Sequence, residues 1–189
     1  TTEIYTLSLH DALPILYRMN SMRRQESPDP MPVPITDAPL TASPGDTARA
    51  FRDALGRFAT GVTLVTTEGP QGPVGFVANS FASVSLEPPL VLWSPAKASA
   101  RFPLFRDARH YAIHVLAVTQ FDLIARFTRQ GAGFDGLPHG RNAQGAPVLE
   151  GALARFDCEQ VATHDGGDHL IILGRVLGFG LQEGAPLVF

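Results

Sequence analysis

The chain has 189 residues and a mass of 20.3 kDa, and 44% of its residues are hydrophobic and 17% are charged. This composition excludes a fully disordered polymer, and a formal net charge of −3 provides no basic surface for nucleic acid. No apolar run reaches the ~20 residues that a membrane-spanning helix requires. A single cysteine, Cys158, excludes an internal disulfide and a cysteine-based zinc cluster. We therefore expect a cytoplasmic protein with no metal, no nucleic-acid partner and no membrane partner.

Residues 1–45 differ in composition from the rest of the chain. All 18 glycines lie at position 45 or later, and six prolines lie within residues 28–44. This proline spacing forces extended backbone, which prevents a helix or a central strand. We therefore expect residues 1–45 to be a disordered or non-native extension and residues 46–189 to form one domain. The apolar end at Phe189 predicts a truncated C-terminus.

The second region is predicted to start with an amphipathic helix and to continue mainly as short strands. Asp46 can cap a helix whose apolar residues recur at helical spacing as far as Phe58. We then expect, in chain order, strands over 62–67, 74–79, 81–86 and 89–94, a helix over 98–107, a strand over 111–118, a helix over 120–130, a glycine-rich loop over 131–147, and strands over 152–162 and 169–180. Many short strands with few helices predict a small β-barrel with helices packed on its outside.

The common catalytic motifs are missing from the sequence. It contains no Gly-x4-Gly-Lys phosphate loop, no Gly-x-Gly-x-x-Gly after a strand and no Gly-x-Ser-x-Gly nucleophile turn. Cys158 lies in a strand-like run, which favours a buried structural thiol. The spacing of His164 and His169 matches no strong metal motif. Hydrolytic and metal-dependent chemistry therefore lack support in the sequence.

One candidate binding region lies within the strands predicted over 74–86. Residues 78–86 place an amide, at Asn79, and several hydroxyls within apolar strands. Unpaired buried polar groups cost roughly 1–3 kcal/mol each, so these side chains need partners. They either face solvent or bind a planar polar ligand at the edge of the barrel, and the residues alone do not choose between these two interpretations.

Two more polar segments are candidates. Residues 94–101 bring Ser99 and Arg101 to a predicted helix start, which suits either an ordinary cap or a phosphate. In residues 166–169 two glycines permit a tight turn, and the aspartate before His169 can orient its ring. Taken alone, this second segment is typical of an ordinary polar turn.

Together these segments resemble the flavin reductase family, whose members are reductase components of two-component monooxygenases. The matching segments are residues 51–62, 78–90, 145–147, 158, 167–169 and 174–176. The resemblance covers residues 48–189 in the family's order. It implies a mainly β fold with flanking helices, the FMN-binding split β-barrel.

The resemblance also implies site residues. Those matching the flavin-contacting segments are Val77, Ala78, Asn79, Ser80, Ser83, Val84 and Ser85, and those matching the region that holds the flavin phosphate or ribityl chain are Ser94 and Ser99. Family members commonly have threonine at position 77, so Val77 leaves only a backbone contact there. His169 matches the histidine beside the flavin and the nicotinamide, and we expect it to position one of these rings.

By this resemblance the protein is an NAD(P)H:flavin oxidoreductase. It would bind FMN or FAD, transfer a hydride from NADH or NADPH to flavin N5, and supply reduced flavin to a partner monooxygenase. The resemblance also implies a homodimer, because an open split barrel commonly covers its apolar face with a second copy. Two alternatives are a non-catalytic flavin-binding electron carrier and an oxidase of a B6-type substrate. A single lysine disfavours the second, because the phosphate of such a substrate requires a basic cluster.

Overall fold

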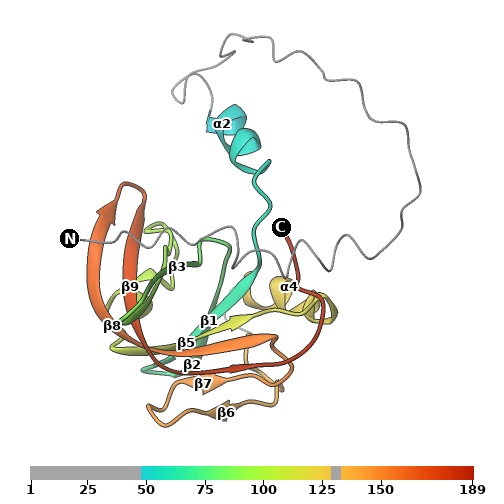
Figure 1. The fold of residues 1–189 in the computed structure, drawn as a ribbon, viewed down its shortest axis with the longest axis vertical. Helices are drawn as coiled ribbons and strands as arrows, with labels where there is room; N and C mark the ends of the chain where they lie inside the picture. Colours follow the sequence, from blue (N-terminus) through green and yellow to red (C-terminus); the bar gives the residue numbers. More distant parts are fainter. Residues whose placement is uncertain (1–47, 129–132) are drawn as a thin grey trace, which may run out of the picture. The chain divides into compact units, whose positions relative to one another are not determined.

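The computed structural model describes residues 48–128 and 133–189, and a seven-stranded sheet forms the body of this part of the chain (Figure 1). Its strands are β1 (Thr63–Gly69), β2 (Gly72–Ala78), β3 (Ala82–Leu86), β4 (Pro89–Trp93), β5 (His110–Val115), β8 (Ala154–Gly166) and β9 (His169–Leu181), and a small ribbon joins β6 (Gly140–Arg141) to β7 (Pro147–Val148). The helical segments are α2 (Ala48–Leu55), α3 (Phe102–Arg106), η1 (Val118–Gln120) and α4 (Asp122–Thr128). The predicted extension over residues 1–45 and the cap at Asp46 lie outside the described residues.

The strands follow one another in the order β2-β1-β5-β8-β9-β4-β3, with every neighbouring pair antiparallel. Although β2 and β4 are far apart in this order, the rings of Phe76 on β2 and Trp93 on β4 have centroids 5.7 Å apart. The sheet therefore curls around its core without closing, as expected for a split barrel. The prediction of a mainly β fold of this type is confirmed.

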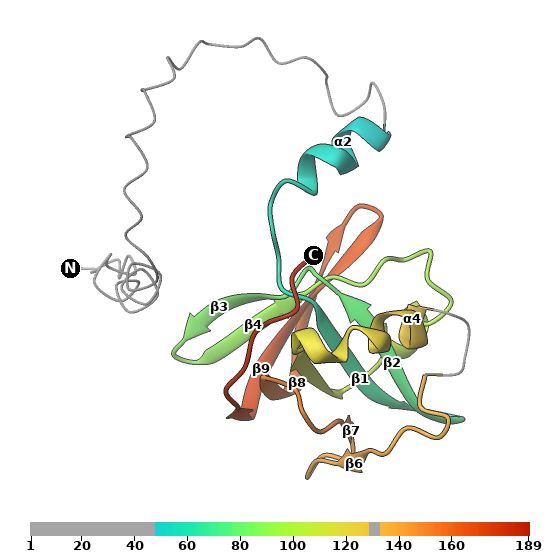
Figure 2. The same cartoon turned by 90° about the vertical axis from the view of Figure 1, so that its right-hand side faces the viewer.

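Aromatic side chains fill the inside of the curled sheet. Trp93, Phe105 and Tyr111 are each 1% exposed or less, and the rings of Trp93 and Phe105 meet edge to face at 5.3 Å. A second apolar cluster lies under α4, whose Leu123 and Phe127 are buried beside strand residues. Figure 2 shows α4 lying across β1 and β2, and α4 contacts β2. The first cluster packs α3 against the sheet through Phe105, and the second packs α4 against it through Leu123 and Phe127.

Several strands are longer than their local sequence pattern indicated. β1 and β2 stay paired as far as Gly69 and Gly72, which leaves a tight turn where a longer one was predicted. β8 runs to Gly166 rather than to 162, because its last residues pair with the start of β9. The β8–β9 hairpin consequently projects beyond the rest of the sheet (Figure 1). These strand ends are set by cross-strand pairing, which the local sequence composition does not predict.

The helices are shorter than predicted. The helix predicted over 98–107 begins only at Phe102, because residues 97–101 form turns, and Ser99 N–H donates to the Ala96 carbonyl at 3.1 Å. The predicted amphipathic helix forms as α2 and ends at Leu55, before Phe58. The apolar side chains of Phe51 and Phe58 are 46% and 77% exposed. In the part of the chain that the structure describes, no helix is long and apolar enough to cross a membrane.

Candidate functional site

The segment 94–101, which follows β4, touches the connection between β2 and β3. The Ser80 hydroxyl accepts a hydrogen bond from Ser94 N–H at 2.9 Å and donates to the Ser94 carbonyl at 3.2 Å. The two hydrogen bonds bring together two of the serines that the resemblance singled out. They also show that the Ser80 hydroxyl is hydrogen-bonded to the backbone of the 94–101 segment.

On its other side the 94–101 segment pairs with the start of β9. Ala96 and His169 form an antiparallel bridge. Lys97 N–H donates to the Asp168 carbonyl at 2.9 Å, and Leu170 N–H donates to the Pro95 carbonyl at 3.1 Å. The segment therefore prolongs the β4–β9 ladder, which places His169 directly beside it.

Lys97, the single lysine of the chain, strengthens this junction. Its Nζ donates to the Gly167 carbonyl at 2.6 Å and forms an ion pair with Asp165. The hydrogen bond from Lys97 holds the pKa of the Asp165 carboxyl below its usual value. Lys97 thus ties the 94–101 segment to the tip of the β8–β9 hairpin. Sequence reasoning gave it no role, although a lone lysine within a candidate binding segment was the available signal.

The orientation of His169 is fixed by the residue before it. Its Nδ1–H donates to the Asp168 carboxylate at 2.7 Å, and this hydrogen bond lowers the pKa of Asp168. Because the proton is held at Nδ1, Nε2 is the ring nitrogen that can hydrogen-bond to a ligand. The His169 side chain is 43% exposed, so a ligand can reach it. The expectation that an aspartate orients this histidine is confirmed by the geometry.

The hydroxyls of β3 lie on an edge strand of the sheet. A bulge separates the pair Ser83–Val91 from the pair Ser85–Leu90 and leaves Val84 without a cross-strand partner. Ser83 and Val84 are exposed, while Ser85 is half-buried. Bulges commonly redirect side chains near binding sites, and this one turns part of β3 outward. Asn79, just after β2, is exposed as well.

Val77 and Ala78 differ from the other candidates because their side chains pack into the molecule. Ala78 belongs to the aromatic core, and Val77 packs against the cluster under α4. The Ala78 carbonyl accepts a hydrogen bond from the Thr63 hydroxyl at 2.7 Å. A ligand beside this end of β2 would therefore meet little of the Ala78 side chain.

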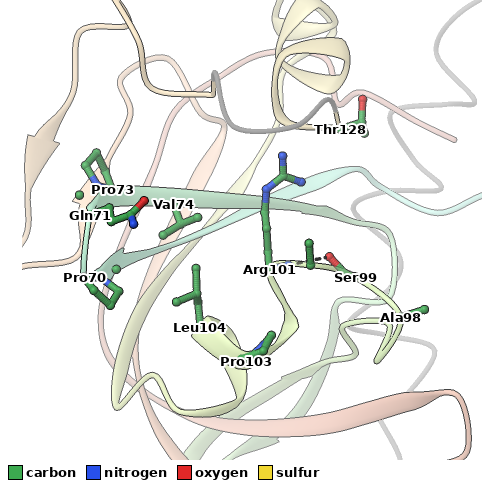
Figure 3. A pocket seen from close by; sticks show the side chains of 13 residues that line it. Pro70, Gln71, Pro73, Val74, Ala98, Ser99, Arg101, Pro103, Leu104 and Thr128 are labelled. Atoms are coloured by element: carbon green, nitrogen blue, oxygen red, sulfur yellow. Dashed lines mark hydrogen bonds between the residues drawn. The ribbon is translucent and has the colours of Figure 1, made fainter.

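Ser99 lines a surface cavity with a volume of about 850 Å³. The cavity lies between the β1–β2 turn and residues 98–104, and Thr128 at the end of α4 also borders it (Figure 3). A second cavity of about 400 Å³ is lined by α4 and residues 137–140, away from every candidate residue. Among residues 48–128 and 133–189, no group of three or more His, Cys, Asp or Glu side chains is arranged to hold a metal ion.

Two further side chains that might suggest chemistry are structural. Cys158 is 1% exposed, and burial raises its pKa to about 12, so the prediction of a buried structural thiol is confirmed. His114 is fully buried, with Nδ1 donating to the Leu64 carbonyl at 3.0 Å and Nε2 accepting from Leu149 N–H at 3.1 Å. Burial lowers the pKa of His114 to about 4. Both of its nitrogens are occupied, which excludes it as a metal ligand.

The candidate site is therefore an exposed junction of several hydroxyls, the Asn79 amide and one oriented histidine, held by the Lys97–Asp165 ion pair at the edge of a split barrel. This arrangement lacks a nucleophile–base pair, and it is typical of proteins that position cofactors whose own chemistry carries the reaction. The chain belongs to the flavin reductase like domain family, which it matches over residues 55–189. The family resemblance found in the sequence is confirmed.

Similar proteins include several that are named as reductases. The chain is 57% identical over 145 residues to the FMN reductase (NADH) SmoA of Agrobacterium fabrum, covering 77% of this chain and 83% of that protein. It is 43% identical over 143 residues to the flavin-dependent monooxygenase reductase subunit HsaB of Rhodococcus jostii, covering 75% of this chain and 73% of that one. Among solved structures, the NADH:FAD oxidoreductase SgcE6 of Streptomyces globisporus C-1027 superposes with a TM-score of 0.74 at 33% identity, over 82% of this chain and 90% of the other.

Proposed function

We propose that the protein is a flavin reductase that oxidises NADH, reduces FMN or FAD, and supplies the reduced flavin to a separate monooxygenase component. The observation that carries this proposal is the 57% identity to a protein named an NADH-dependent FMN reductase, over most of both chains. The match to a monooxygenase reductase subunit supports the partner oxygenase.

The donor set of the site fits a flavin. Asn79, Ser83 and Ser85 offer neutral donors and acceptors along an open edge, as a polar ring system requires, and Ser94 and Ser99 lie on the segment beside His169. A bound flavin supplies the acceptor for a hydride from the nicotinamide. The protein's own contribution is to align the two rings and limit their motion, which requires no acid–base pair.

His169 is the residue that we assign to this alignment. Asp168 fixes its tautomer, and the 94–101 segment fixes its backbone. His169→Ala should raise the KM for NADH or lower kcat, because one ring would lose its positioning partner. His164→Ala, at an exposed histidine on the same hairpin, serves as the matched control. Unchanged steady-state kinetics for the His169 variant would remove this role.

The activity is tested by following the loss of NADH absorbance with FMN, FAD or riboflavin as acceptor, with NADPH in parallel. We expect turnover that depends on added flavin, and transfer of the reduced flavin to an added oxygenase component under anaerobic conditions. A yellow protein that binds flavin but oxidises neither nucleotide would instead be an electron carrier, and this result would overturn the proposal.

We also propose a homodimer. Large apolar side chains remain exposed on β3 and β9, among them Leu86 at 89%, Phe179 at 73% and Leu181 at 73%. Exposed apolar surface of this kind usually marks an interface. Size-exclusion chromatography with light scattering tests this, and a monomer at all concentrations would contradict it.

We further assign residues 46–189 to the reductase domain, which the match over residues 55–189 supports, and we place the protein in the cytoplasm. The free, buried thiol of Cys158 supports a reducing compartment.

A further inference from the structure

The cavity of about 400 Å³ beside α4 has no part in the proposed flavin site. Its described lining comes from η1, α4, residues 137–140 and residues 149–150, and it includes none of the residues assigned to flavin binding. We propose that this cavity binds a small organic amine in its protonated form, as a ligand separate from the flavin and the nicotinamide nucleotide.

The buried part of the cavity lining is apolar. Leu123 and Leu149 are 6% and 7% exposed and belong to the cluster under α4, against which Leu137 also packs. Leu149 N–H donates to the buried ring of His114 at 3.1 Å, so this wall is anchored in the core. The apolar body of a ligand would displace water from these leucines. The volume lies toward the lower end of the roughly 300–1,000 Å³ typical of ligand sites, which favours a small molecule.

Two carboxylates on the cavity rim have no cationic partner. Asp122 and Glu150 line the cavity and are exposed, and neither forms an ion pair with another described residue. Arg126, four positions after Asp122 on α4, donates instead to the carbonyls of Gly133 and Asp135. The described lining contains no lysine and no arginine. The charge of the cavity therefore favours a cation over an anion.

Gln120 holds the two sides of this rim together. Its Oε1 accepts from Ala117 N–H at 3.1 Å, and its Nε2 donates to the Glu150 carbonyl at 3.1 Å. Gln120 lies two positions before Asp122, so these hydrogen bonds tie the backbone on the Asp122 side to the backbone that carries Glu150. The rim is thus fixed before a ligand arrives, which lowers the entropic cost of binding.

His139 adds a further acceptor to the rim. Its Nδ1–H donates to the Leu137 carbonyl at 2.9 Å, and its ring meets Phe134 edge to face with centroids 4.9 Å apart. This hydrogen bond leaves Nε2 as the accepting nitrogen. A primary ammonium carries three N–H donors and no acceptor, so acceptors above an apolar surface complement a protonated amine. A metal ion fits less well, because the described residues contain no group of three or more His, Cys, Asp or Glu side chains arranged to hold one.

The probe for this site is benzylammonium, which joins an ammonium group to a flat apolar ring. Benzyl alcohol and benzoate keep the ring and replace the cation by a neutral and an anionic group. Binding is measured by saturation-transfer NMR, with the flavin-free protein and with protein saturated with FMN. We expect benzylammonium to bind at least about tenfold more tightly than the other two probes. Saturation with FMN should change its Kd by less than about twofold.

Charge variants test the rim. Asp122→Asn and Glu150→Gln each remove one negative charge at an exposed position, and Asp135→Asn removes one at an exposed position outside the cavity lining. We expect each rim variant to raise the Kd for benzylammonium about threefold, and the double variant about tenfold. The Asp135 control should leave this Kd unchanged.

A bulky variant tests the cavity itself. Gly140 is exposed and lines the cavity, and a Cβ added there would meet only Val148 Cγ2, at an ordinary contact distance of 3.5 Å. Gly140→Trp therefore adds an indole at the cavity wall, whereas Ala143→Trp adds the same bulk at an exposed turn outside the cavity. We expect Gly140→Trp, and not Ala143→Trp, to abolish benzylammonium binding.

Several results would overturn the proposal. They are equal affinities for the three probes, no binding of benzylammonium at millimolar concentration, and a Kd that the double charge variant or Gly140→Trp leaves equal to that of its control. Loss of benzylammonium binding on saturation with FMN would overturn it as well, because the probe would then occupy the flavin site. These measurements involve neither NADH nor turnover, so their failure is distinct from a failure of the proposed reductase activity.

Discussion

Protonation of the buried His114 is expected to destabilise the fold in mildly acidic solution. The neutral ring satisfies two backbone groups at once, because Nδ1 donates to the Leu64 carbonyl and Nε2 accepts from Leu149 N–H. A second proton would place an N–H at Nε2 against the Leu149 N–H, within a site that is fully buried. Arg155 on β8 also lowers the pKa of His114, and Asp157 opposes it.

The magnitude follows from the pKa values of the two states. The folded value is about 4, mainly because of burial, whereas an unfolded histidine titrates near 6.5. Between these values the unfolded chain binds more protons, so the free energy of unfolding falls as the pH is lowered. Since one pH unit corresponds to about 1.4 kcal/mol, the full interval represents about 3 kcal/mol. This is a large part of the 5–15 kcal/mol that is typical of a domain.

The assay compares the natural protein with His114→Gln in urea unfolding, at several pH values from 7.5 down to 4.5 or so. Glutamine can donate to Leu64 and accept from Leu149, and it does not titrate. The single tryptophan, Trp93, is fully buried and reports unfolding by fluorescence. Flavin is omitted, because a bound ligand would add its own stabilisation. The difference between the two proteins isolates His114 from the surface carboxylates.

We expect the natural protein to lose stability below pH 6.5 more steeply than His114→Gln, so that the two curves move steadily apart down to about pH 4.5. If the two proteins lose stability in parallel throughout this range, His114 does not titrate as the geometry requires and the reasoning is refuted.

Three other substitutions test separate parts of the structure. Lys97→Met should lower kcat/KM for NADH about tenfold, because the 94–101 segment loses its hydrogen bond and ion pair to the hairpin tip. Lys97→Arg keeps the charge and should retain most of the activity. Steady-state kinetics test this, and equal losses in both variants would contradict it. Phe179→Glu should convert the proposed dimer to a monomer in light scattering, since a charge would replace an exposed apolar contact; an unchanged mass would remove β9 from the interface. Gly174→Ala should reduce the free energy of unfolding by about 1–3 kcal/mol in urea, because its Cβ would lie 2.1 Å from the Tyr111 hydroxyl oxygen. Gly178→Ala, with no atom within 4 Å of the added Cβ, is the matched control, and equal effects would disprove the clash.

The local sequence pattern was sufficient to predict the bounds of strands that lie between turn residues, and to predict that the thiol is buried. β3 and β4 were predicted to within one residue, because Asn79-Ser80 and the prolines after Glu87 interrupt the chain where the strands do. Cys158 was predicted to be a buried structural thiol because it lies in a strand-like run, and it is buried. Strand ends that are set by cross-strand pairing, such as the end of β8 at Gly166 opposite His169, were missed.

The sequence by itself therefore identified the family, through its resemblance, and predicted the succession of most strands along the chain, because local backbone preference favours these segments as strands. It also supplied the residues that are proposed to bind a flavin. The tertiary structure decided which of these residues meet. Ser80 contacts Ser94, and Lys97 reaches a hairpin almost seventy positions further along the chain. It also separated Ala78, whose side chain is in the core, from exposed Ser83. Such contacts depend on register and on the curl of the sheet, which are set by cross-strand pairing over the whole molecule.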